Sequence, residues 1–158
     1  MEKSLQSEKI RHQTLLLGVI QITFGCIVGF IPPDAVPWFR GIVMAHIEFT
    51  ANGVLLLVLG FLVREKKLGS KTFWIWFISL QTGTWLNGRS GLIAAFSGQS
   101  SKLLSTISKT YPPPNALENH AVFFTLIVSG LTVLIRLGLT IAGLIRGFST
   151  NRVVEKNS

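Results

Sequence analysis

Charged residues and cysteine are scarce in this chain of 158 residues. Only 14% of its residues are charged, whereas 48% are hydrophobic, a balance too apolar for an ordinary soluble domain. The single cysteine, Cys26, excludes an intrachain disulfide and a cysteine metal cluster. The sequence also has no Walker loop, no H-E-x-x-H motif and no serine nucleophile elbow, so nothing in it supports these nucleotide, zinc-protease and hydrolase chemistries.

Four long apolar stretches dominate the chain instead. Each is long enough for a helix to cross the hydrocarbon layer of a membrane, which takes about 20 residues. Prolines or clustered charges bound the stretches, and proline ends a helix because it lacks an amide donor. The stretches are residues 14–31, 41–63, 72–97 and 119–148. The sequence predicts an all-α, integral membrane four-helix bundle, one domain over residues 1–158, with polar, mobile tails at about 1–12 and 150–158.

Lysine and arginine are spread unevenly among the segments that connect the predicted helices. The positive-inside rule places the richer segments in the cytoplasm. The two ends and the middle connection carry ten: Lys3, Lys9, Arg11, Arg64, Lys66, Lys67, Lys71, Arg146, Arg152 and Lys156. The other two connections carry three: Arg40, Lys102 and Lys109. Both termini are therefore predicted to be cytoplasmic. The net charge of +8 indicates attraction to lipid headgroups, because no basic soluble domain remains to bind nucleic acid.

Polar residues within the predicted spans gather in the outer half of the membrane. A polar side chain in a span usually faces the interior of a bundle or a cavity. Counted along the helical rise, three spans contribute at similar depth. The residues are His46, Glu48 and Asn52 in the second span, Asn87 and Arg89 in the third, and Glu118, Asn119 and His120 at the start of the fourth. This convergence predicts a buried site.

The second span carries two polar stripes. His46, Thr50 and Gly53 fall on one side, and Glu48 and Asn52 fall roughly 120–160° away. Small residues leave a groove below the imidazole. Such a groove admits another helix, or a flat cofactor whose iron the imidazole ligates, and the spacing alone favours helix packing.

Glu48 needs a partner, because an unpaired carboxylate is very unfavourable in lipid. Arg89 is the predicted partner, either in a structural ion pair or in a catalytic, substrate-orienting group. Trp85 is deep enough to line a pocket, whereas Trp74 and Trp76 are predicted to anchor the membrane boundary. Arg136 is predicted to reach the cytoplasmic interface or to pair within the bundle.

The motif His46-x-Glu48-x-x-x-Asn52-Gly53, followed by Thr-Trp-Leu-Asn at residues 84–87, resembles the hydroxylaminobenzene mutases. Styrene oxide isomerases, which are also four-span proteins, share the histidine and the Asn-Gly pair at this spacing but lack the glutamate. The resemblance covers all four spans in outline. Its specific part is about twenty residues of the second span and a few of the third.

This resemblance implies a membrane isomerase that rearranges a small aromatic substrate, of the hydroxylaminobenzene to aminophenol type. It also implies a homotrimer that holds haem b between subunits, with ferric iron as a Lewis acid and no net redox change. By resemblance His46 is the iron ligand. The resemblance also implies that Asn52 contacts the substrate. Together with the polar and small residues of the spans, this predicts Thr50 and Gly53 beside the cofactor, Asn52, Glu48 and Arg89 as catalytic groups, and Trp85, Asn87 and Gly91 in the substrate pocket.

One departure separates the two reactions. The isomerases have a pocket tyrosine where this chain has Gly91, so Gly91 and Glu48 together favour the mutase reaction. The alternatives are an epoxide isomerase of the styrene oxide type, a non-enzymatic membrane haem protein, and a structural or transporter-like protein of four spans. Only His46 lies well inside a span, which favours an open iron position over two axial histidines.

Overall fold

The computed structural model describes the backbone of residues 2–156 and the side chains of residues 5–149. Over these residues the chain is helical and forms no β-sheet. The long helices are α1 (Glu2–Gly29), α2 (Phe39–Phe61), α3 (Ser70–Ser97) and α5 (His120–Lys156). The short helical segments are η1 (Pro33–Ala35), η2 (Leu62–Glu65), η3 (Lys102–Leu104) and α4 (Ser105–Thr110).

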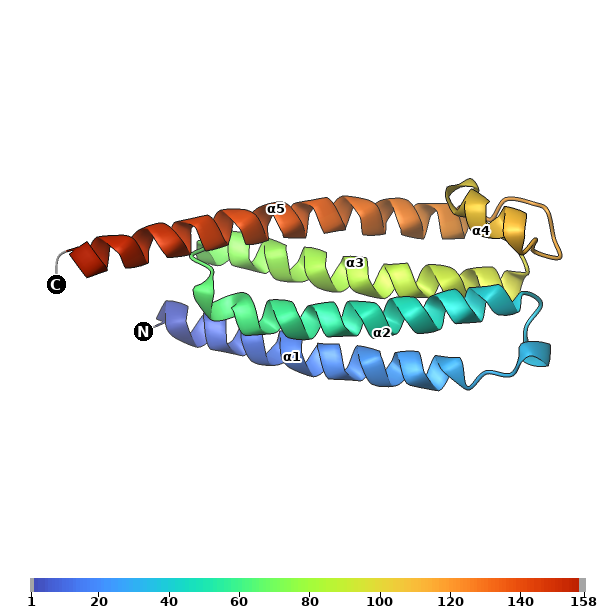
Figure 1. The fold of residues 1–158 in the computed structure, drawn as a ribbon, viewed down its shortest axis with the longest axis horizontal. Helices are drawn as coiled ribbons and strands as arrows, with labels where there is room; N and C mark the ends of the chain where they lie inside the picture. The colour runs from blue at the N-terminus through green and yellow to red at the C-terminus, as the bar shows by residue number, and fades with distance from the viewer. Residues whose placement is uncertain (1, 157–158) are drawn as a thin grey trace.

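The long helices run antiparallel and side by side in chain order (Figure 1). α1 packs along α2, α2 along α3, and α3 along α5, whereas no comparable contact joins α2 to α5 in the described part of the chain. Because an even number of helices traverses the bundle, α1 begins and α5 ends at the same end, beside the α2–α3 connection (Figure 1). The start of α1 and the end of α5 therefore lie at one end of the bundle, and their placement in the cytoplasm stays a prediction.

Local sequence explains where the helices end. Pro32 and Pro33 follow α1 and cannot continue it. Gly98 follows α3 with a φ of 65°, a left-handed conformation that glycine adopts without strain. Asn119 caps α5, since its Oδ1 accepts hydrogen bonds from the backbone N–H groups two and three residues later, at 3.0 and 3.1 Å.

The ends of the chain correct the predicted boundaries. α1 begins at Glu2, not near residue 14, and α5 continues to Lys156. Both tails are therefore helical over residues 2–12 and 150–156, and residues 1, 157 and 158 lie outside the described residues. A helix needs no apolar side chains to continue beyond the lipid, and ion pairs of Glu8 with Arg11 and Arg64 support the first turns of α1.

Three helical stretches are long and apolar enough to cross a membrane: Leu5–Gly29, Phe39–Glu65 and His120–Ser149. They expose many large apolar side chains, as lipid-facing helices do. α3 is as long as α1, at 28 residues, but its more polar composition keeps it out of this set within the described residues. The protein is thus a helical bundle with several helices able to span a membrane, and a fourth span through α3 stays a prediction.

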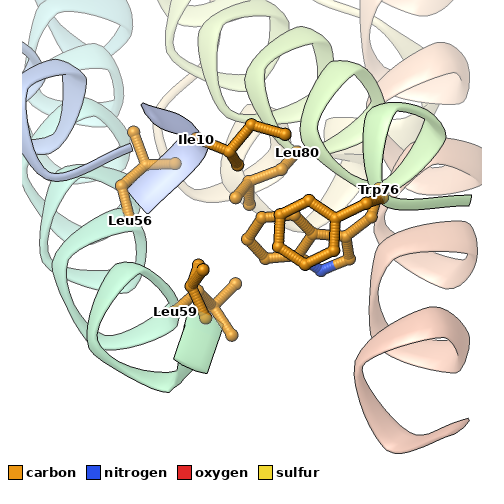
Figure 2. Close-up of a cluster of buried hydrophobic side chains, with 7 residues drawn as sticks. Ile10, Leu56, Leu59, Trp76 and Leu80 are labelled. Atoms are coloured by element: carbon orange, nitrogen blue, oxygen red, sulfur yellow. The ribbon is translucent and has the colours of Figure 1, made fainter. Parts of the chain in front are cut away.

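A buried apolar cluster lies between the helices near the start of α1. Figure 2 shows Ile10, Leu56, Leu59, Trp76 and Leu80 in this cluster. The Trp76 ring is fully buried and its Nε1 donates a hydrogen bond to Thr140 Oγ1 at 2.9 Å. The prediction that Trp76 anchors the membrane boundary is wrong, because the ring joins α3 to α5 instead. Trp74 is exposed and keeps that predicted role.

Candidate functional site

His46 lies half-buried in the contact between α1 and α2. Its Nδ1 is 2.8 Å from the Gly25 carbonyl oxygen. A carbonyl only accepts, so in the neutral ring Nδ1 carries the proton and Nε2 keeps a free lone pair. A Cβ at Gly29 would lie 2.8 Å from Nδ1, so the ring needs glycine at that position. The geometry therefore fixes both the ring position and the tautomer that leaves Nε2 available to a metal.

The small residues below His46 form a helix-packing surface. A Cβ at Gly53 would lie 2.6 Å from Ile22 Cγ1, and one at Gly60 would lie 2.8 Å from Leu15 Cδ2. Thr50 Oγ1 donates to the His46 carbonyl oxygen at 2.8 Å. The sequence allowed this side of α2 either to pack against a helix or to hold a flat cofactor. Gly53 and Gly60, on this side of α2, pack against α1. Gly53 is covered by α1 and has no part in the cofactor site proposed below.

The second stripe of α2 meets α3 in a small polar cluster. Asn87 Nδ2 donates to Glu48 Oε2 in a short hydrogen bond, and Asn52 Nδ2 donates to the same oxygen at 3.4 Å. Asn52 is buried, whereas Glu48 and Asn87 are half-buried. Two amide donors on one oxygen hold the carboxyl group in one orientation. The cluster can accept or deliver a proton and can donate hydrogen bonds to a polar substrate atom.

The predicted ion pair between Glu48 and Arg89 does not form. Arg89 is exposed, and the ion pairs among the described side chains do not include it. Arg89 lies two residues beyond Asn87, which turns it roughly 200° around α3. Asn87 occupies the position that faces Glu48, so an amide takes the place predicted for the guanidinium.

Trp85 belongs to a cluster of three aromatic rings next to the polar cluster. Its ring centroid lies 5.7 Å from that of Phe49 on α2 and 6.0 Å from that of Phe24 on α1. The Phe24 and Phe49 centroids are 4.9 Å apart with the rings perpendicular. Such edge-to-face packing adds about 0.5–1.5 kcal/mol per pair beyond simple burial. The rings join α1, α2 and α3 beside Glu48 and give the site an aromatic flank.

Gly91 lies at a close crossing of α2 and α3. A Cβ there would lie 2.7 Å from the Ala45 backbone nitrogen and 2.8 Å from the Gly41 carbonyl oxygen. The prediction that Gly91 lines a substrate pocket is therefore wrong, because the backbone of α2 fills the space. A tyrosine at this position would force the two helices apart.

The start of the fourth span does not join the site. Glu118 pairs with Lys102 at 3.1 Å, and this contact lowers the pKa of the Glu118 carboxyl. The Asn119 amide donates to Ser97 Oγ at 3.0 Å, and His120 is exposed. These residues stabilise the connection between α3 and α5, so the predicted convergence of three spans is correct only for α2 and α3.

Gly25 and Gly29, which both contact His46, were not predicted from the sequence. Gly18, Gly25 and Gly29 lie at spacings of seven and four, which places them on one face of α1. This face matches the His46 stripe of α2, so the spacing was the available signal.

The prediction that Arg136 reaches the cytoplasmic interface or pairs within the bundle is also corrected. Arg136 is buried beside Gly83, and its Nε and Nη1 have no hydrogen-bond partner among the described residues.

The fold and the site define an all-helical membrane protein with an oriented imidazole and a hydrogen-bonded carboxyl group on opposite sides of one helix. The chain belongs to the styrene oxide isomerase family, whose model matches residues 10–145. Membership in this family indicates a membrane isomerase. Comparisons with curated proteins and with solved structures gave no significant match.

Proposed function

We propose that this protein is a membrane-bound isomerase that rearranges a small aromatic substrate, converting a hydroxylaminobenzene-like compound into an aminophenol. The proposal includes four spans with cytoplasmic termini, a homotrimer, and haem b ligated by His46. The observation that carries it is the contact of His46 Nδ1 with the Gly25 carbonyl at 2.8 Å, which leaves Nε2 free for iron. The family match supports the isomerase class.

The residues around His46 fit a haem ligand. The tautomer is set by a backbone carbonyl, as for many metal-binding histidines, and the ring is only half-buried. Bound ferric haem would supply a Lewis acid for the substrate oxygen. The described residues contain no cluster of three or more metal-binding side chains, so a single axial ligand is the arrangement that suits this chain.

Glu48, Asn52 and Asn87 handle the substrate in this proposal. In the rearrangement the N–O bond breaks, a C–O bond forms on the ring, and one proton leaves the ring carbon while the nitrogen gains one. The Glu48 carboxyl group accepts the ring proton and returns a proton to nitrogen, so no net proton or electron is exchanged. The amide groups of Asn52 and Asn87 hold the carboxyl in position.

The geometry of α2 supports the proposed trimer. His46 and Glu48 are two residues apart, so their side chains leave the helix roughly 200° apart. One chain therefore cannot place both groups on one small substrate. At the boundary between two copies in a closed ring of identical chains, a neighbouring copy can supply the group that one chain leaves out of reach. We propose that the active site lies at this boundary.

Spectroscopy of the purified protein tests the cofactor proposal. We expect a Soret band in the wild type, its loss in His46→Ala, and a weakened or shifted band in Gly29→Ala, because a Cβ at Gly29 collides with the imidazole. Gly130→Ala is the matched control, since nothing lies within 4 Å of a Cβ there. A colourless wild-type protein that retains activity would contradict the cofactor proposal.

Epoxide isomerisation is the second candidate, favoured by the matched family's description. Incubation with hydroxylaminobenzene and with styrene oxide, followed by product analysis, separates the two reactions. We expect aminophenol from the first and little aldehyde from the second, because Glu48 supplies a proton carrier and Gly91 supplies no hydroxyl group. Aldehyde as the main product would replace the first proposal with the second.

A further inference from the structure

A basic pocket lies at the end of the bundle where α1 begins. Its volume is about 420 Å³. The lining residues are Gln6, Ser7, Glu8, Arg64, Lys66, Lys67, Leu68, Ser70 and Phe73. Phe73 also belongs to the apolar cluster that Figure 2 draws, so the core closes the pocket from the bundle interior. The pocket adjoins the ends of the apolar stretches Leu5–Gly29 and Phe39–Glu65, which places it at the level of lipid headgroups.

The pocket holds more positive than negative charge. Arg64, Lys66 and Lys67 line it, and Glu8 is its one lining carboxylate. Arg64 Nε pairs with Glu8 Oε1 at 2.8 Å, and Arg11 shares the same carboxylate at 3.3 Å. Among the described side chains no carboxylate pairs with Lys66 or Lys67. With both lysines protonated, three cations against one carboxylate leave a charge of +2 that this part of the chain does not neutralise.

Lys66 is the most unusual group in the pocket. Its side chain is buried, at 5% exposed, with Nζ 3.4 Å above the Trp76 ring centroid and 3.4 Å from the Leu59 carbonyl oxygen. Burial lowers the pKa of the Lys66 ammonium to about 7. A buried cation without an anionic partner is costly, and an anion in the pocket would offset that cost.

Neutral donors complete the pocket. α3 begins at Ser70, and no side chain caps its first turn, so backbone N–H groups at this end need partners. The N-terminus of a helix also carries a partial positive charge that favours anions. Ser70 Oγ donates to Gln6 Oε1 at 2.6 Å, which ties α1 to the start of α3 across the pocket.

We propose that this pocket binds a phosphate group, carried either by the headgroup of an anionic lipid or by a free phosphate ion. The lysines act as point charges. Arg64 donates from Nε and Nη2 to the two oxygens of Glu8, and its Nη1 N–H groups can donate to a phosphate oxygen. A volume of about 420 Å³ accommodates a glycerophosphate headgroup. The bound group holds the first turns of α1 against the α2–α3 connection, so it stabilises the folded bundle.

Thermal unfolding of the full chain in neutral detergent tests the proposal. The probes are dihexanoyl phosphatidylglycerol, dihexanoyl phosphatidylcholine and inorganic phosphate at matched ionic strength. We expect a saturable rise in apparent Tm with phosphatidylglycerol and none with phosphatidylcholine. In Lys67→Gln the apparent Kd for phosphatidylglycerol should rise about tenfold, the effect of losing one charge-assisted hydrogen bond.

Lys71→Gln is the matched control, because Lys71 is exposed like Lys67 but does not line the pocket. Its apparent Kd should stay within about twofold of the wild type, since it removes the same charge from the same region. A saturable rise with inorganic phosphate that is also weakened in Lys67→Gln assigns the site to free phosphate. No saturable rise with either phosphate probe, or equal weakening by both lysine variants, overturns the proposal.

Discussion

At the scale of single residues, the candidate site depends on two side chains that different partners hold in place. The Gly25 carbonyl of α1 orients His46, and the amides of Asn52 and Asn87 orient Glu48. The sequence predicted both site residues, because a histidine and a glutamate in an apolar helix need a reason to be there. It did not predict Gly25, since the glycine spacing on α1 indicates a helix-packing face but not which backbone carbonyl accepts from the imidazole 21 residues away.

Glu48→Gln tests whether the carboxyl group carries a proton. We expect kcat to fall about 10²- to 10⁴-fold, the usual contribution of a general acid–base group, while the haem spectrum stays unchanged. The spectrum should not change because Glu48 does not ligate the iron in the proposed site. Steady-state kinetics of product formation, with the absorption spectrum recorded on the same sample, measures both.

Glu118→Gln makes the same chemical change in the connection before α5 and should leave kcat within about twofold, since this carboxyl pairs with Lys102 outside the site. If Glu48→Gln retains wild-type kcat, the carboxyl group is a structural hydrogen-bond acceptor and the proton-transfer role is wrong.

At the scale of helices, hydropathy located all four long elements but not their ends. The apolar stretches follow from the thickness of a membrane, whereas α1 extends well before residue 14 because ion pairs of Glu8 support its polar turns. The close crossing of α2 and α3 was also missed. In the sequence, small residues such as Gly91 and Gly41 suit a pocket or a helix contact equally well. Only the position of the neighbouring backbone shows that both glycines serve a helix contact.

Gly91→Tyr tests two points together. The first is the close contact of α2 and α3 at Gly91, and the second is whether the tyrosine of styrene oxide isomerases can be accommodated at this position. We expect destabilisation of about 1–3 kcal/mol, because the ring must displace the backbone near Ala45. We also expect no gain in aldehyde formation from styrene oxide, since the ring has no cavity to enter at this position. Thermal unfolding and product analysis measure the two effects.

The same substitution at Gly130, where a Cβ meets nothing within 4 Å, is the control and should change stability by less than about 0.5 kcal/mol. A Gly91→Tyr protein that is as stable as the wild type and newly active on the epoxide would show that α2 and α3 leave room for a pocket tyrosine.

At the scale of the whole molecule, the stability of the bundle should depend on pH through Lys66. The pKa of Lys66 is about 7 in the folded protein and near its ordinary value of 10.5 when the chain unfolds. Between these values the unfolded chain binds more protons, so the free energy of unfolding rises with pH. Below pH 7 Lys66 is protonated in both the folded and the unfolded state, so it adds no pH dependence to the free energy of unfolding.

We therefore expect a gain of about 2 kcal/mol between pH 7 and pH 9 in phosphate-free buffer, measured by thermal unfolding. Lys66→Met should remove this dependence, and Lys71→Met should keep it, because Lys71 is exposed. A wild-type profile that is flat over this interval would show that Lys66 is not held as a buried cation.

The arrangement of whole helices also has a practical consequence. Since α1 starts and α5 finishes at the same end of the bundle (Figure 1), copies can be joined in tandem by linkers that stay at that end. A covalent trimer of this kind fixes how many copies carry an altered histidine or an altered glutamate, and in which order. Shared catalysis between neighbours then becomes countable, copy by copy, within one polypeptide.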